Sequence, residues 1–169
     1  MNKLTTICVI RRSKILIVLT AALFGLMTLI NNVTDYAAYA DYIGHIISMS
    51  NTEGNDSRRY RAITSNMFHH RFYWAIISLE TIFTFSCMAG TYQLYRKVDA
   101  PRQEFHEAKK FAIAGLVTGI FVYQALYVTI LNEWFDMDYS VHRNTYIWAQ
   151  NNIEYMFFGL IFLKAIKDS

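Results

Sequence analysis

Four long apolar runs constrain the fold of this chain more than any other feature of its sequence. They cover roughly residues 15–33, 72–94, 111–131 and 145–163. An α-helix crosses the hydrocarbon core of a bilayer in about 20 residues, and each run is close to that length. Apolar residues fill the runs instead of forming one helical stripe, which is typical of membrane spans. We therefore predict an all-α, integral membrane four-helix bundle that forms a single membrane domain over residues 1–169.

A cleaved signal peptide is the alternative for the first run, which has a basic start and Ala38-Tyr39-Ala40 as a candidate cleavage site. Its apolar run is longer than the roughly 7–15 residues of a signal peptide, and the candidate cleavage site lies far beyond its end. We interpret the run as a span.

The Lys and Arg residues predict the orientation. Residues 1–14, residues 96–110 and the C-terminal tail hold eleven of them, whereas the loops 31–71 and 132–144 hold five. Loops rich in Lys and Arg stay in the cytoplasm, so both termini are predicted to be cytoplasmic. The cations flank apolar runs and form no basic stripe, which argues against a nucleic-acid partner.

The first outer loop is predicted to be an ordered cap over residues 34–71. Tyr36, Tyr39, Ala40, Ile43 and Ile47 fall at helical spacing with polar residues between them. This pattern predicts a short amphipathic helix on the outer membrane surface. Either Thr64 or Ser65 is expected to N-cap the helix that enters the second span.

One short pattern occurs twice in the spans. "WAIISLE" at Trp74–Glu80 recurs as "WAQNNIE" at Trp148–Glu154. The repetition favours two helical hairpins in the same orientation, a parallel repeat. The Trp residues are expected at the outer interface, where amphipathic rings are favoured.

The two glutamates lie deep in their spans. At 1.5 Å per residue, Glu80 is roughly 12 Å from Phe72 and Glu154 roughly 13 Å from Thr145. An ionised carboxylate facing lipid costs several kcal/mol, so both should face the interior of the bundle. The predicted intramembrane polar site consists of Glu80, Gln124, Gln150, Asn151 and Glu154. It would either bind a proton, an ion or the head of a quinone or lipid, or be a structural hydrogen-bond network that fixes helix register.

A second polar group is predicted at the outer rim of the bundle. It comprises Asn31, Asn32, Asp35, His45, His69, His70, Glu133 and Trp134. No familiar metal-ligand spacing is present, and adjacent histidines point about 100° apart on a helix. We expect histidines that hydrogen-bond interfacial groups, and no metal site.

Two glycines mark a helix contact. Gly115 and Gly119 form a GxxxG pair in the third run, and small residues at this spacing let helices approach closely. Packing inside the bundle is the favoured interpretation, with dimerisation or docking onto a partner as the alternative.

The order of several motifs resembles a known family. "NNVTDY" at 31–36, "HIISMS" at 45–50, "YRAITSNMFHHRFYW" at 60–74 and "EWFDM" at 133–137 are similar to a bacterial family of predicted small integral membrane proteins, a domain of unknown function. The resemblance implies a four-span inner-membrane protein of about this size. It implies no activity and no catalytic residues.

No catalytic triad, phosphate loop or nucleotide fingerprint is present, so the sequence favours a non-enzymatic role. The leading hypothesis is an accessory or scaffold subunit of a larger membrane complex, with the bilayer and other membrane-protein subunits as partners. The alternative is binding of a quinone, lipid or metal around Glu80 and Glu154, with a redox role. No cofactor is identified. The apolar inner halves of the spans make a transporter the least favoured class.

Overall fold

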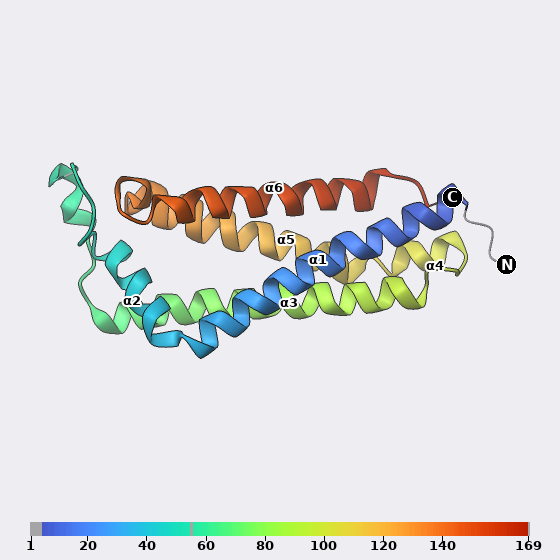
Figure 1. Cartoon of the computed structure of the whole chain (residues 1–169), viewed down its shortest axis with the longest axis horizontal. Helices are drawn as coiled ribbons and strands as arrows, with labels where there is room; N and C mark the ends of the chain where they lie inside the picture. The colour runs from blue at the N-terminus through green and yellow to red at the C-terminus, as the bar shows by residue number, and fades with distance from the viewer. Residues whose placement is uncertain (1–4, 55, 169) are drawn as a thin grey trace.

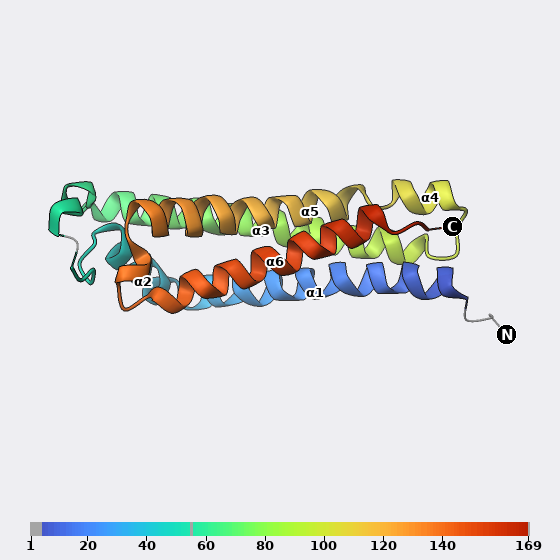
Figure 2. The same cartoon turned by 90° about the horizontal axis from the view of Figure 1, so that it is seen from above.

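The computed structural model describes residues 5–54 and 56–168, and its regular elements are helices. Four long helical segments run side by side along the molecule (Figures 1 and 2). They are α1 (Thr6–Thr34), α3 (Asn66–Arg96), α5 (Lys110–Phe121) with its continuation η2 (Val122–Trp134), and α6 (Arg143–Ala165). All four predicted runs thus lie on helices, and each helix extends beyond its run at both ends.

Three helical segments are long and apolar enough to cross a membrane: Thr6–Thr34, Asn66–Arg96 and Arg102–Trp134. The last of these includes the short helix α4 (Arg102–Glu107). Helix α6 has the length of a span, but Gln150, Asn151 and Glu154 lower its hydropathy. Crossing of the membrane by α6 therefore stays a prediction.

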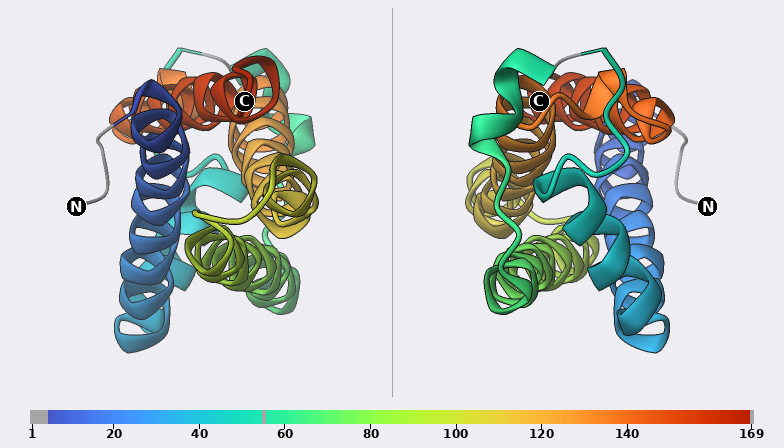
Figure 3. Two further views of the ribbon diagram at one scale, coloured as in Figure 1. Left: turned by 90° about the vertical axis from the view of Figure 1, so that its right-hand side faces the viewer. Right: turned by 90° about the vertical axis from the view of Figure 1, so that its left-hand side faces the viewer.

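The two ends of the molecule differ. At one end α1 begins, α6 ends and α4 makes the connection between α3 and α5 (Figures 1 and 2). At the other end lie α2 (Tyr36–Ile47), η1 (Asp56–Arg61) and η3 (Met137–Tyr139) (Figures 1 and 3). An ion pair of 2.7 Å between Arg58 and Asp136 and a β-bridge between Thr52 and Ser140 join the two loops of this cap.

Helix α2 forms at the predicted position, but its apolar side does not rest on lipid. Ala40, Ile43, Ile46 and Ile47 are all buried, and α2 packs on α3. The prediction of an interfacial helix on the membrane surface is therefore corrected. Burying this face inside the protein removes the same apolar area from water without a bilayer. Ser65, one of the two predicted N-caps, accepts a hydrogen bond from the backbone N–H of Phe68 and begins α3.

Glycines set the close approach of α5 to its neighbours. A Cβ on Gly115 would lie 2.6 Å from Cys87 Sγ on α3, and one on Gly119 would lie 2.4 Å from Met156 Sδ on α6. Both glycines of the predicted pair thus pack inside the molecule. The closest approach to backbone comes from the opposite direction, where a Cβ on Gly90 of α3 would lie 2.4 Å from the backbone nitrogen of Ala112.

The second half of the third long helical segment is a π-helix. Segment η2 continues α5 without a break, and the backbone N–H of Phe135 bonds the carbonyl of Ile130, five residues earlier. π-Helical turns are rare and often occur at functional sites. This one carries Tyr123 and Tyr127, both buried, which form one wall of the polar centre described below.

Candidate functional site

Glu80 is the centre of a buried hydrogen-bond network between three helical segments. Its side chain is fully buried on α3. Asn32 of α1 donates its amide N–H to Oε2 at 2.5 Å, and the hydroxyl of Tyr123 of η2 donates to Oε1 at 3.4 Å. Tyr73, also on α3, donates its hydroxyl to the backbone carbonyl of Asn32 at 3.2 Å. The network therefore fixes the register of α1 against α3 and η2.

Aromatic rings surround this network on its outer side. The Tyr123 ring lies 5.8 Å from Phe24, 5.3 Å from Trp148 and 5.5 Å from Tyr127, measured between centroids. The Trp148 contact is edge-to-face, a favourable geometry for aromatic pairs. Trp148 is the only residue of α6 among these rings, so it is the contribution of α6 to the site.

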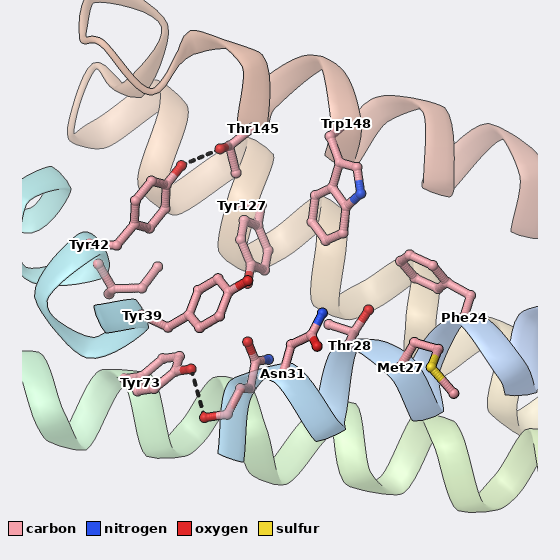
Figure 4. A pocket seen from close by; sticks show the side chains of 12 residues that line it. Phe24, Met27, Thr28, Asn31, Tyr39, Tyr42, Tyr73, Tyr127, Thr145 and Trp148 are labelled. Carbon is pink, nitrogen blue, oxygen red and sulfur yellow. Dashed lines mark hydrogen bonds between the residues drawn. The ribbon is translucent and has the colours of Figure 1, made fainter. Parts of the chain in front are cut away.

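A cavity of about 470 Å³ opens beside the network (Figure 4). Its twelve lining residues come from α1, α2, α3, η2 and α6: Phe24, Met27, Thr28, Asn31, Asn32, Tyr39, Tyr42, Ile43, Tyr73, Tyr127, Thr145 and Trp148. Half of them are aromatic and none is charged. The cavity is within the volume range of small-molecule sites, roughly 300–1,000 Å³.

The remaining members of the predicted intramembrane site do not join Glu80. Glu154, Gln150 and Asn151 are exposed on α6, and Gln124 is exposed on η2. Gln150 donates to the Tyr146 hydroxyl on its own helix, at 2.6 Å. The prediction that Glu154 faces the interior and meets Glu80 is therefore wrong.

Helix rotation explains this error. Six residues of α-helix turn through about 600°, so the Trp and the Glu of each repeated pattern point about 120° apart. Only one of them can face the core squarely. In α3 the core residues include Ile76, Glu80 and Phe83, whereas in α6 they include Ala149 and Met156. Helix α6 therefore presents a different face of the same pattern.

The outer-rim residues fall into separate groups. Asn32 belongs to the Glu80 network and Asn31 lines the cavity, while Asp35 and Glu133 are exposed. His70 shares a hydrogen bond of 2.9 Å with the Tyr36 hydroxyl.

The other rim histidines also have local partners. His69 donates to the carbonyl of Ile63 at 2.6 Å, and His45 lies 3.3 Å from Asp41. Trp134 lies under the guanidinium of Arg61, 4.7 Å from it. Among the described residues, no three His, Cys, Asp or Glu side chains are grouped as a metal site.

A second buried polar centre lies at the opposite end of the molecule. The Asp168 carboxylate accepts from Lys14 of α1 at 2.6 Å and from Lys109, which precedes α5. Arg11 binds the carbonyls of Val98, Ala100 and Asp168.

This centre holds the tail after α6 against α1 and α5. Burial alone would raise the pKa of Asp168, but the hydrogen bonds from Lys109 and Lys14 outweigh burial and lower it. Sequence reasoning missed this centre because Lys14 and Asp168 are 154 residues apart. The signal available was one acid in a tail that otherwise carries lysines.

The comparisons with known proteins agree with the membrane character of these helices. No curated protein and no solved structure matches the chain. A family model described as "Predicted small integral membrane protein (DUF2165)" matches residues 10–165. This match includes all four long helical segments apart from the first turn of α1, and also Glu80 and the cavity. The chain therefore belongs to this family of predicted small integral membrane proteins.

Proposed function

We propose that this protein is a non-enzymatic accessory subunit of a larger membrane complex and that α6 docks against a partner subunit. The observation that carries the proposal is the outward polar stripe of α6, formed by Gln150, Asn151 and Glu154. The stripe is flanked by exposed apolar side chains, among them Phe157 and Phe158. Glu154 lies roughly 16 Å along the helix from Arg143, which is well inside a span.

The polar stripe of α6 would lose its contacts with water inside a bilayer. A carboxylate and two amides facing lipid would lose their hydrogen bonds to water, at several kcal/mol for the carboxylate alone. A neighbouring membrane helix that supplies N–H or O–H donors removes this cost. Polar side chains commonly hydrogen-bond across helix pairs in membranes. We therefore expect the partner to be another integral membrane protein with donor side chains at this depth.

The proposal includes a topology. Helix α6 crosses the membrane as the fourth span of a four-helix bundle in the bacterial inner membrane, and both termini face the cytoplasm. The start of α1 and the end of α6 lie at the same end of the molecule, where Arg96–Lys110 also lies (Figure 1). This grouping agrees with the distribution of Lys and Arg. The hairpins α1–α3 and α5–α6 then form the parallel repeat.

The test is native purification from membranes in several mild detergents, followed by mass spectrometry of the co-purifying proteins. We expect a stable membrane partner, lost in Glu154→Leu. The matched control is Thr20→Leu on α1. Thr20 is also exposed, but its hydroxyl already bonds the carbonyl of Leu16, so the partner should be retained. A lone monomer in every detergent, or a partner retained by Glu154→Leu, would contradict the proposal.

A second candidate function is small-molecule binding beside Glu80. The cavity favours it, because five helical elements converge on a space with six aromatic side chains and a π-helical wall. Glu154 has no part in this version of the site. Native mass spectrometry that detects bound small molecules tests it, and it predicts a ligand lost when the cavity is filled by Thr28→Phe. A mass that always equals that of the bare chain would exclude it.

A further inference from the structure

We propose that the cavity binds the head of a membrane quinone or quinol, that is, a neutral planar ring with carbonyl or hydroxyl oxygens and an apolar tail. The inference rests on the second candidate function and names its ligand class. Three properties of the cavity support it: the absence of charge, the aromatic walls and the polar groups that lack a partner.

The absence of charge in the cavity lining indicates that the head group of the ligand is neutral. None of the twelve lining residues carries a formal charge, and Glu80 is separated from the cavity by Asn32, which it binds. An anionic or cationic head group would have no counter-charge there, and an uncompensated charge in an apolar site costs several kcal/mol. A neutral head group avoids this cost.

The aromatic walls of the cavity indicate the shape of the ligand. Tyr127 and Trp148 face the cavity from η2 and α6, while Tyr73 and Tyr39 face it from α3 and α2 (Figure 4). Flat aromatic faces bind planar rings by offset stacking or by edge-to-face contact. A saturated acyl chain has no ring and cannot form these stacking or edge-to-face contacts. The walls therefore favour a ring.

The polar groups without a partner indicate which substituents the ring of the ligand carries. The amide of Asn31 and the hydroxyl of Tyr127 form no hydrogen bond with any other residue that the structure describes. Tyr127 is 7% exposed and lines the cavity, and its hydroxyl is not fully enclosed by protein, so it can form a hydrogen bond with a ligand there. Asn31 projects from α1 toward the η2 and α6 side (Figure 4). Two groups on opposite walls suit a ring with oxygens on opposite edges.

The open side of the cavity indicates where the apolar tail of the ligand lies. Met27, which lines the cavity, is 54% exposed on α1, and Tyr39 is 38% exposed on α2. Met27 belongs to the apolar helix α1 and Tyr39 to the cap helix α2, so this side of the cavity lies where the cap meets an apolar helix. A ligand enters from the bilayer by this side, and its apolar tail remains in lipid while the ring occupies the cavity.

The test uses the fluorescence of Trp148. In a Trp74→Phe, Trp134→Phe background, Trp148 is the only indole of the full chain, reconstituted in phosphatidylcholine nanodiscs. Decylubiquinone is titrated, because a quinone that contacts the indole quenches its emission. We expect saturable quenching that Asn31→Leu and Tyr127→Phe each weaken at least tenfold in Kd. Thr20→Leu, a change at an exposed position of α1 that does not line the cavity, should leave Kd unchanged. Circular-dichroism melting verifies that every variant is folded.

Competition separates the inference from the function on which it rests. Decanol has a tail of the same length and no ring, and phosphatidylglycerol supplies an anionic head. If either displaces the quinone at equal concentration, the cavity binds small molecules but the ring class is wrong. Quenching that Asn31→Leu and Tyr127→Phe do not change overturns the placement of the ring. If no probe produces saturable quenching, both the inference and the second candidate function fail.

Discussion

Helices α3 and α6 carry the same pattern of Trp, Ala and Glu and use it in opposite ways. In α3, Glu80 is fully buried and Trp74 is 57% exposed. In α6, Trp148 packs against Tyr123 and lines the cavity, while Glu154 is exposed. A rotation of the helix about its axis is sufficient to exchange the two roles. Similar spacing therefore predicts how far along each helix a residue lies and leaves the direction of each side chain undecided.

The strongest test of this comparison exchanges the two glutamates for leucine. Glu80→Leu leaves the Asn32 amide and the Tyr123 hydroxyl buried without an acceptor, which should cost about 3 kcal/mol of unfolding free energy. Glu154→Leu should change the stability of the isolated chain by less than about 0.5 kcal/mol. Unfolding in mixed micelles with increasing dodecyl sulfate measures both. Glu80→Gln keeps an acceptor and should lose less. Equal losses at positions 80 and 154 would refute the comparison.

The packing of the same two helices can also be compared by substituting one glycine in each. A Cβ on Gly90 of α3 meets the backbone of Ala112, which cannot move alone, so Gly90→Ala should cost about 2 kcal/mol. On α6, a Cβ on Gly159 meets the Cγ2 methyl group of Ile17 at 2.9 Å and a methyl group of Leu116 at 3.9 Å, which are side-chain atoms and not backbone. Gly159→Ala should therefore cost less than Gly90→Ala. The same micelle titration distinguishes them, and a larger loss at Gly159 would show that α6 is the more tightly packed helix.

The two tryptophans give a smaller difference. Trp148→Ala removes contacts with Phe24, Tyr123 and Tyr127, and because Trp148 is only partly buried we expect about 1.5 kcal/mol, half or less of a full core deletion. Trp74→Ala should cost clearly less, since its ring contact is with Tyr36 at 5.8 Å. Thermal melting in detergent compares the two. A greater loss for Trp74 would reverse the roles inferred for the two helices.

The smallest effect concerns the start of α6 and pH. Burial lowers the pKa of His142, and the charge of nearby His45 lowers it further. The folded state thus binds fewer protons than the unfolded state, whose His titrates near 6.5, so stability is present above that pH and is lost as pH falls below it. Protection factors at residues 140–146, that is, the intrinsic exchange rate divided by the observed rate at each pH, should fall between pH 7.5 and pH 5. His142→Gln should remove this dependence, while the amides of α3 remain unaffected in both proteins.

The length of the apolar runs predicted the long helical segments, and Ser65 was one of two predicted N-caps, because both are local properties of the sequence. Contacts between helices were not predictable in the same way. The bond between Asn32 and Glu80 joins residues 48 positions apart, and nothing in either pattern indicates the rotation that brings them together. Because this rotation is not visible in the sequence, the sequence pattern predicts Asn32 in the outer rim and not beside Glu80. The π-helical turn of η2 was also invisible, since its residues are ordinary helix and strand formers.

The contact between Lys14 and Asp168 also has a consequence for biogenesis. Lys14 lies on α1, and its partner Asp168 leaves the ribosome 154 residues later. During insertion the charge of Lys14 is therefore free to influence the orientation of α1. Once the tail arrives, the same ammonium is enclosed beside Asp168 and no longer faces water. One side chain thus acts first as a topology signal and later as a fastening between the first and the last helix.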